Sequence, residues 1–463
     1  MVQRLPLNLR FRANANYYSS IRTQQTYQQN LDRATQSTRR MDANLSGSWS
    51  EYSLSATIER IDHFRGEKSF TRTGSLPRVT FTRGERPIGG APIYFGVNSE
   101  LVTIERSTTT AGLTSDDNGL SRFDLNPTLR IPFTRWPFLT VNSTVSWRGT
   151  YWTESCADRR PGSDETACPA TRLAQVPEAI GRQFFDFQAR FTGPVFNRIW
   201  NTPGGGYAEK YKHVVQPTFT IRRTTAIDNF ERIVRLDGTD FTVGGTQFTY
   251  GVSNRLYAKK ETSREILTAT VSQSYFTDRR GSQYDSQNQS GHGQTPASNF
   301  GVVGLQVRGA PTDQLQADFR TEWDPTAHSL RSLALNGTAS AGTWLQTSGG
   351  WSQIRYIPKF NDPSSATNYL NASVDLRRAG GRLGTSYAFN YDLRRDTFLQ
   401  QRYTAYYNAQ CCGIAVEYQT FNLSGGFSSL GILEDKRFNL SFTLAGIGTF
   451  SNLFGAFGGQ QGR

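Results

Sequence analysis

The sequence predicts an all-β protein, a large antiparallel transmembrane β-barrel of the outer-membrane type with about 20–26 strands. Three observations predict it: apolar and polar residues alternate along many segments, these segments are long, and long and short connections alternate between them. We expect the barrel to occupy residues 1–450 and a C-terminal tail to occupy residues 451–463.

The alternation is clearest between Leu139 and Tyr151, where Leu139, Val145 and Tyr151 fall on one face and Thr140 and Arg148 on the other. Successive side chains of a strand point to opposite faces, so this segment has one apolar and one polar face. The last clear strand repeats the pattern. Its apolar face consists of Phe438, Leu440, Phe442 and Leu444.

The length and number of these segments favour a membrane barrel. Several run for about ten residues, whereas soluble strands average roughly five or six and transmembrane strands need roughly 9–11. About twenty segments are more than an open sheet usually holds, and a closed barrel satisfies every backbone group in lipid. Because soluble sandwiches also alternate, a soluble adhesin or carbohydrate-binding protein is an alternative, which would stay monodisperse without detergent.

The connections show a second regularity. Short turns are expected at 135–137, 310–312 and 379–382, and long polar connections at 155–179, 226–245, 277–298, 358–366 and 424–435. Outer-membrane barrels have short periplasmic turns and long external loops. The pattern therefore places the C-terminus and the connection at Cys411 and Cys412 on the periplasmic side. The connection 192–210 is long for a turn and breaks the pattern.

The composition excludes other classes. No apolar run is long enough for a transmembrane helix, and 30 Phe, 20 Tyr and 8 Trp are too many for a disordered chain. The opening residues lack the apolar core of a secretory leader, which the β pattern suggests has been removed. A net charge of +13 either solvates loops or points to an anionic partner. With no dense basic run or nucleic-acid motif, a phosphorylated membrane lipid is favoured over nucleic acid.

No catalytic or metal-binding constellation is present in the sequence. The four His residues are scattered, and there are no paired CxxC motifs for zinc. Without a nucleophile–histidine arrangement, a lipid-modifying hydrolase is disfavoured. We therefore expect no enzyme activity, no metal and no cofactor.

The four cysteines form two different pairs. Cys156 and Cys168 lie in one long polar loop, where an oxidising compartment would favour a local disulfide over two free thiols. Cys411 and Cys412 are adjacent, and a disulfide between neighbours is strained. Each therefore pairs elsewhere, or both are inert thiols at a strand end.

The residues around the adjacent cysteines resemble a known family. The stretches 407–418 and 437–448, a tandem cysteine at the start of a late strand followed by the final strand, resemble the C-terminal end of the LptD family of lipopolysaccharide-assembly proteins. Weaker similarity at 125–128, 214–217 and 249–257 extends the resemblance over about residues 75–450.

The resemblance implies a translocon in the outer membrane of a Gram-negative bacterium. In that family, lipopolysaccharide arrives over a periplasmic bridge that ends in a β-jellyroll, passes through the barrel wall and enters the outer leaflet, while a plug lipoprotein, LptE, fills the lumen. Cys411 and Cys412 would form disulfides with N-terminal cysteines. This chain has no evident jellyroll, so we expect those partners, and the first barrel strands, to lie outside it. The strand with Phe438, Leu440, Phe442 and Leu444 would form one side of the lateral opening. A passive porin or receptor barrel is the alternative, testable by ion conductance without a plug.

The positive charge then has a candidate role. Alternation places Arg130, Arg148, Arg222 and Arg255 on the lumen face, and arginine binds phosphate in a bidentate manner. Ordinary solvation of the lumen explains the same four residues.

Overall fold

The structure is a computed structural model that describes residues 2–21, 23–24, 36–66, 69–110, 112–117, 119–157, 175–285, 291–378, 380–422, 434–444 and 448–451. Twenty-four strands join into one sheet, and two short strands form a second one. All the strand pairs are antiparallel, so the predicted fold class is confirmed. In the described part of the chain, no helix is both long and apolar enough to cross a membrane.

The strands of the first half are β1 (Val2–Arg4), β2 (Leu9–Asn16), β3 (Thr38–Trp49), β4 (Tyr52–Phe64), β5 (Phe70–Pro87), β6 (Tyr94–Thr110), β7 (Leu113–Asp117), β8 (Leu120–Trp136), β9 (Leu139–Trp152), β10 (Ser155–Cys156), β11 (Gln175–Val176), β12 (Ile180–Thr192), β13 (Phe196–Asn201) and β14 (Lys210–Thr224).

The strands of the second half are β15 (Gly245–Lys259), β16 (Ser263–Phe276), β17 (Val303–Thr312), β18 (Leu315–Asp324), β19 (Ser329–Ala341), β20 (Leu345–Ile354), β21 (Thr367–Arg377), β22 (Leu383–Asp392), β23 (Thr397–Asn408), β24 (Cys412–Asn422), β25 (Glu434–Leu444) and β26 (Gly448–Ser451). In the described parts of the connections lie the short 3-10 helices η2 (Phe230–Arg232), η3 (Arg279–Gln283) and η5 (Pro363–Ser365).

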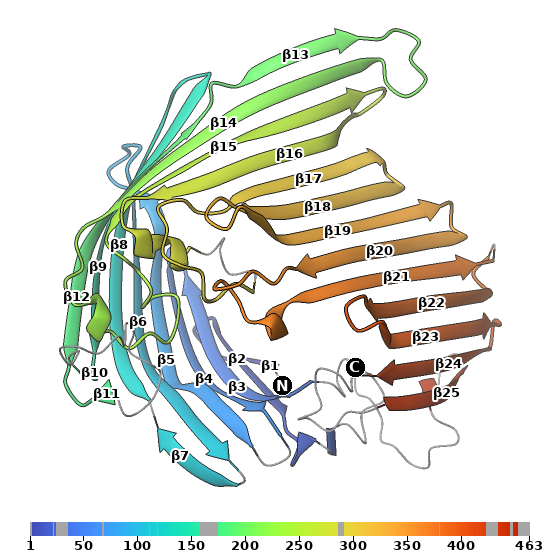
Figure 1. The fold of residues 1–463 in the computed structure, drawn as a ribbon, viewed down its shortest axis with the longest axis horizontal. Coiled ribbons are helices and arrows are strands. Elements are labelled where there is room, and N and C mark those ends of the chain that lie inside the picture. Colours follow the sequence, from blue (N-terminus) through green and yellow to red (C-terminus); the bar gives the residue numbers. More distant parts are fainter. Residues whose placement is uncertain are drawn as a thin grey trace.

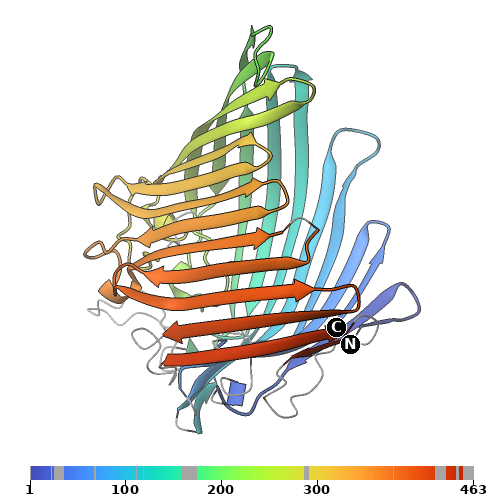
Figure 2. The ribbon, with the colours of Figure 1, turned by 90° about the vertical axis from the view of Figure 1, so that its right-hand side faces the viewer.

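The large sheet is a succession of hairpins in chain order. β7 is a side strand on β6, which pairs directly with β8, and the wall continues from β9 to β12 and from β12 to β14. The sheet curls around a central space, so that its first and last strands approach each other (Figures 1 and 2). In the described part, β1 pairs only with β2, and β26 pairs only with β25. Among the described residues, no ladder joins the two edges of the sheet.

The two ends of the curled sheet differ. Tight turns such as those between β3 and β4, β8 and β9, and β19 and β20 lie at one end, which we call the short-turn end. The connections from β9 to β12, β14 to β15, β16 to β17 and β20 to β21 lie at the other, the long-connection end. Some turns there are also short, as between β18 and β19. The alternation predicted from the sequence is thus largely present.

The outer face of the wall is apolar. Because cross-strand partners lie on one face of a sheet, the register identifies this face by its exposed large side chains, among them Ile131, Tyr151, Phe185, Phe219 and Tyr250. Such a band is what a lipid-facing barrel surface requires.

Three segments differ from the sequence-based expectation. The connection 192–210 is no simple loop, because β13 pairs with β14 directly beyond the point where β12 ends. Residues 225–244 fold into the barrel instead of extending away from it (Figure 1). Beyond the strand expected to be the last, β26 pairs with residues 441–444 of β25. Residues 452–463, most of the expected tail, lie outside the described residues.

Candidate functional site: an arginine cluster and a pocket in the lumen

The wall register places the four predicted arginines on the lumen face. Arg222 pairs with Gln188, Gln188 with Thr144, and Thr144 with Arg130, so all four side chains share one face. Arg148 lies four residues after Thr144 on the same strand and shares its face. Arg255 lies eight residues after Gln247, which pairs with Arg222. The opposite face of these strands is the apolar outer surface.

Residues 225–244, which we call the inserted segment, pack against this lumen face. Ile233 and Val234 are buried there in one apolar cluster with Leu120, Trp152 and Ile180 of the wall. Burying each such side chain contributes roughly 1.5–3 kcal/mol. The segment is therefore docked on the wall by an apolar contact as well as by polar ones.

The sequence Leu236–Asp240 folds into a turn that presents two carboxylates. The Asp240 carboxylate accepts the backbone N–H groups of Leu236 and Asp237 at 2.9 and 3.0 Å, and Asp237 accepts that of Thr239 at 2.9 Å. Aspartate side chains commonly satisfy nearby backbone donors in this way. The turn thus aims both carboxylates at the wall.

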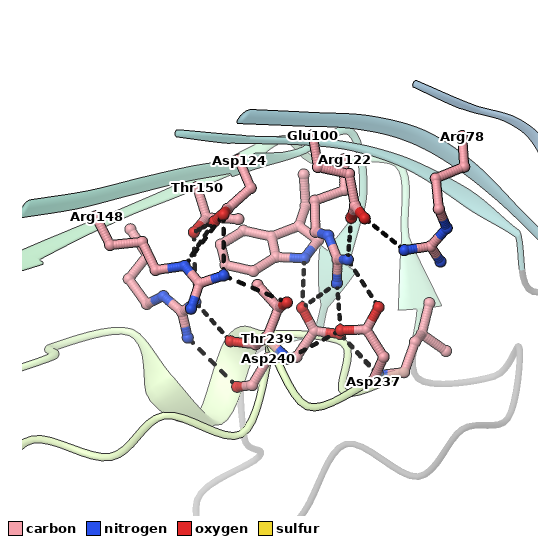
Figure 3. Close-up of polar contacts among 12 residues, drawn as sticks. Arg78, Glu100, Arg122, Asp124, Arg148, Thr150, Asp237, Thr239 and Asp240 are labelled. Atoms are coloured by element: carbon pink, nitrogen blue, oxygen red, sulfur yellow. Dashed lines mark hydrogen bonds and ion pairs between the residues drawn. The ribbon is translucent and has the colours of Figure 1, made fainter. Parts of the chain in front are cut away.

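Arg122 of β8 receives these carboxylates. Its guanidinium donates to Asp237 at 2.8 and 2.7 Å, to Asp240 at 2.8 Å and to Glu100 of β6 at 2.7 Å (Figure 3). The side chain is only 1% exposed. Removing one partner from a buried ion pair costs about 3–5 kcal/mol, so Arg122 is the main polar anchor of the inserted segment.

Three further arginines surround this anchor. Arg78 pairs with Glu100, and Arg148 donates from two nitrogens to Asp124 at 2.9 Å. Arg182 donates to the backbone oxygens of Thr239 and Asp240 at 2.9 and 3.3 Å. The lumenal cluster therefore contains four arginines, Arg78, Arg122, Arg148 and Arg182, and four carboxylates, Glu100, Asp124, Asp237 and Asp240. Its formal charge is balanced, which suits a structural role better than anion capture.

The pKa of Asp237 reflects this docking. Burial alone would raise the pKa, but the hydrogen bond and charge of Arg122 outweigh burial and hold it below the usual value of an aspartate. Asp237 is thus ionised in the docked segment at neutral pH.

A pocket of about 460 Å³ lies beside the cluster, between the inserted segment and the starts of β15 and η3. Arg148 and Arg222 both line it, together with Phe241 and Tyr284. The structure therefore brings two of the four predicted arginines into one cavity. Arg222 is the more available of them, because its Nε donates to Asp186 at 2.7 Å while its two terminal nitrogens have no partner among the described residues. Its side chain is 47% exposed.

The other two predicted arginines lie away from this pocket. Arg130 is near the short-turn end of β8, where it pairs with Glu85 at 2.5 Å and lies over the ring of Tyr94. Arg255 is in the half of β15 nearer the turn to β16. Of the four predicted arginines, only Arg148 and Arg222, which lie nearer the long-connection end, line the pocket.

The tandem cysteines lie at the start of β24, and the strand expected to border the lateral opening is β25. The Sγ atoms of Cys411 and Cys412 are 3.0 Å apart and both cysteines are free. Cys411 lies in the turn between β23 and β24 at the short-turn end, and Cys412 begins β24. Cys156 is buried in β10, but Cys168 lies outside the described residues, so their pairing stays a prediction. On β25, Phe438 pairs with Tyr418 and Phe442 pairs with Ile414. Both partners have exposed side chains on the outer face.

Arg122, Asp237 and Asp240 were not among the site residues predicted from the sequence. Arg122 and Asp124 alternate on the polar face of β8, which begins at Leu120, upstream of the residues 125–128 that the sequence singled out. The two aspartates lie in a segment expected to be a polar loop. Among the described residues, no group of three His, Cys, Asp or Glu side chains could hold a metal ion.

Comparison with known proteins gives one strong match. Residues 3–381 match the family model described as LptD, LPS transport system D. The tandem cysteines and β25 lie beyond the matched residues. No curated protein matches the sequence significantly.

Solved structures show only distant likeness. The siderophore receptor PirA of Acinetobacter baumannii is 8% identical, with 88% of this chain and 71% of that chain covered and a TM-score of 0.35. The ferric enterobactin receptor PfeA of Pseudomonas aeruginosa is 8% identical, with 88% of this chain and 71% of that chain covered and a TM-score of 0.37. The copper transporter OprC is 10% identical, with 96% of this chain and 73% of that chain covered and a TM-score of 0.34. The fold is therefore described by the chain's own strand pairing.

Proposed function

The chain belongs to the LptD family of the lipopolysaccharide transport system, and from this premise we propose that it inserts lipopolysaccharide into the outer leaflet through a lateral opening between β1 and β26. Members of this family are transport proteins of the Gram-negative outer membrane and not enzymes. The match over residues 3–381 is the observation that carries the proposal.

The proposed opening is supported by the meeting of the two sheet edges. β1 has three residues and β26 has four, and the described residues contain no ladder between them. Elsewhere neighbouring strands share long ladders, as between β14 and β15. Because unpaired backbone groups are costly in lipid, an edge pair with so few hydrogen bonds is where the wall can part at least cost. The outward residues Phe438, Leu440, Phe442 and Leu444 would face lipid beside this seam.

The lumen pocket is the proposed contact for the phosphates of the lipid. The two terminal nitrogens of Arg222 have no partner in the part of the chain that the structure describes, and Arg148 lines the same pocket. A guanidinium with two parallel donors matches a phosphate group. Arg222 would make the primary contact because Arg148 is already engaged by Asp124.

The phosphate contact is tested by Arg222→Gln and by Arg148→Gln. We expect Arg222→Gln to lower both lipopolysaccharide crosslinking in the lumen and delivery to the cell surface several-fold, with Arg148→Gln weaker. Arg320→Gln is the matched control, since Arg320 also pairs with an aspartate but does not line the pocket. Equal crosslinking in all three variants would reject the pocket as a phosphate site.

The lateral opening is tested with engineered cysteine pairs that join β1 to β26. A pair that forms a disulfide should stop delivery of lipopolysaccharide, and a reductant should restore it. The control pair Ala339→Cys and Thr347→Cys joins residues that the ladder between β19 and β20 already holds opposite each other. Delivery through a barrel locked between β1 and β26 would reject the lateral route.

The proposed partners follow from the same premise. A plug lipoprotein similar to LptE would fill the remaining lumen, and a jellyroll at the end of the periplasmic bridge would deliver the lipid. Cys411 and Cys412 would form disulfides with cysteines of that jellyroll region, since they lie free at the short-turn end, which outer-membrane barrels direct to the periplasm.

A further inference from the structure

The outer face of β2–β5 is hollowed by a groove of about 640 Å³. We call this the outer groove; its apolar lining consists of Ala13, Ala15, Met41, Ala43, Ile58 and Leu76. The alanines leave space where other strands carry aromatic side chains, and Leu76 lies at a bulge between β4 and β5 and between β5 and β6.

The register places this groove outside the barrel. Thr57 pairs with Arg78, whose side chain belongs to the lumenal cluster, so Thr57 faces the lumen. Ile58, the next residue, therefore faces outward, and it is 53% exposed. Ala43 pairs with both Ile58 and Ala13, which puts all three on the outer face.

Charged residues lie along one rim of the groove. Arg60 is two residues from Ile58 on the same face and pairs with Glu105 of β6 at 3.3 Å. The Nε atom of Arg60 and the Oε2 atom of Glu105 are buried and have no hydrogen-bond partner among the described residues. The side chain of Arg60 as a whole is nevertheless 39% exposed, so the rim is open to a polar ligand group.

A second charged group continues the rim. Asp62 is buried and accepts from Arg39 at 2.7 Å and from Arg72 at 2.7 Å. The rim therefore has three arginines, Arg39, Arg60 and Arg72, and two carboxylates, Asp62 and Glu105. Charges on the lipid face of a barrel cost about 2–4 kcal/mol near the membrane midplane and about 0–1 near its surface. A net positive rim on this face points to an anionic partner at the membrane surface.

The depth of the rim agrees with this expectation. Arg60 lies eight residues beyond Tyr52, which starts β4 at the short-turn end. At about 3.3 Å per residue and a tilt of about 40°, Arg60 stands roughly 20 Å above that end. The apolar band of such barrels is about 25 Å tall. Arg60 is thus near the outer-leaflet headgroups, with the groove in the acyl layer below it.

We propose that the outer groove binds lipid A of lipopolysaccharide as it leaves the wall, with an acyl chain against Ala13 and Ala43 and a phosphate at Arg60. This inference rests on the proposed function and adds a second site outside the lumen. Two observations favour lipid A: the rim is net positive at the depth of the outer leaflet, and β2, which forms one side of the groove, pairs with the edge strand β1.

Site-specific photocrosslinking in intact outer membranes tests the proposal. Benzoylphenylalanine replaces Ile58 in the groove or, as a matched control, Phe187, which is similarly exposed on β12. We expect lipopolysaccharide adducts at Ile58 at least five-fold above those at Phe187. Arg60→Gln and Ala43→Leu should each lower the yield at Ile58 several-fold, whereas Ala189→Leu on the outer face of β12 should not.

A third probe separates the two proposals. Benzoylphenylalanine at Phe241 reports on the lumen pocket. Lipopolysaccharide adducts at Phe241 with none above control at Ile58, or with only phospholipid at Ile58, would overturn the outer groove and leave the proposed function standing. A yield of adducts at Ile58 that does not change in the Arg60→Gln variant would also overturn the proposal that the outer groove binds lipid A. Adducts at neither position would count against the proposed function itself.

Discussion

Arg122 and Asp237 lie 115 residues apart in the sequence and are joined by two hydrogen bonds of 2.8 and 2.7 Å. Arg122 belongs to the wall and Asp237 to the inserted segment. The contact therefore contributes, with the apolar cluster of Ile233 and Val234, to holding residues 225–244 in the lumen, and it can be broken without changing the backbone hydrogen bonds of the sheet.

Arg122→Leu should release the inserted segment while the barrel stays assembled. The substitution leaves Asp237, Asp240 and Glu100 without their shared partner, at a cost of about 3–5 kcal/mol. We expect higher single-channel conductance and faster amide hydrogen exchange confined to the inserted segment. Arg320→Gln should change neither quantity. An unchanged exchange rate in the segment would mean that its apolar contacts hold it alone.

The docking of the inserted segment should be insensitive to pH around neutrality and weaken in acid. The pKa of Asp237 is lowered in the folded state, so its stabilising contribution is complete above the unfolded pKa of about 4 and is lost as the pH falls through the folded value. Conductance should therefore be flat from about pH 7 to about pH 4 and rise only below that range. Asp237→Asn should raise conductance at neutral pH and flatten the acid step. A step near pH 6 would contradict this assignment.

Gly193, at the junction of β12 and β13, should not tolerate a side chain. Its φ is +107°, and a Cβ would lie 2.3 Å from the backbone oxygen of Phe138. We expect Gly193→Ala to destabilise the barrel by about 1–3 kcal/mol, measured as a lower temperature of the electrophoretic shift on heating. Gly206→Ala is the control, because a Cβ added there would have nothing within 4 Å and the φ of this glycine is ordinary. Equal shifts for both variants would refute the steric argument.

Cys411 and Cys412 should form disulfides with other cysteines in the protein as it is made in the cell. Both are free at the short-turn end, where Cys411 is exposed and Cys412 is partly exposed. Non-reducing electrophoresis should show a cross-linked form that persists in either single Ser variant and disappears in the double variant. Cys156→Ser should leave that form in place. Titration of two free thiols at 411 and 412 in oxidised protein would exclude the pairing.

Alternation predicted the wall well because strand side chains have a strict period of two. The segment expected at 139–151 is β9, Leu139–Trp152, and the expected final strand lies within β25. The lumen face of Arg148 and Arg222 follows from the same periodicity. Their meeting in one pocket could not be predicted, because it depends on the register of strands that are distant in the sequence.

Two other features, the pairing of β13 with β14 and the course of the inserted segment, could not be predicted from the local sequence. Gly193 and Pro194 interrupt the pattern between β12 and β13 and indicate a turn, whereas the backbone continues along β14. The inserted segment is rich in polar residues and lacks periodicity, so it resembles an external loop. Its place is set by the burial of Ile233 and Val234 and by Arg122, and these are tertiary contacts.

The inward course of the β14–β15 connection also determines what the outside of a cell can detect. Residues that pack against the lumen wall present little surface to an immunoglobulin or a phage tail fibre. Serum raised against a peptide of residues 230–240 should therefore bind the denatured protein on a blot but fail to stain intact bacteria. Vaccine design on this barrel would have to choose a different connection.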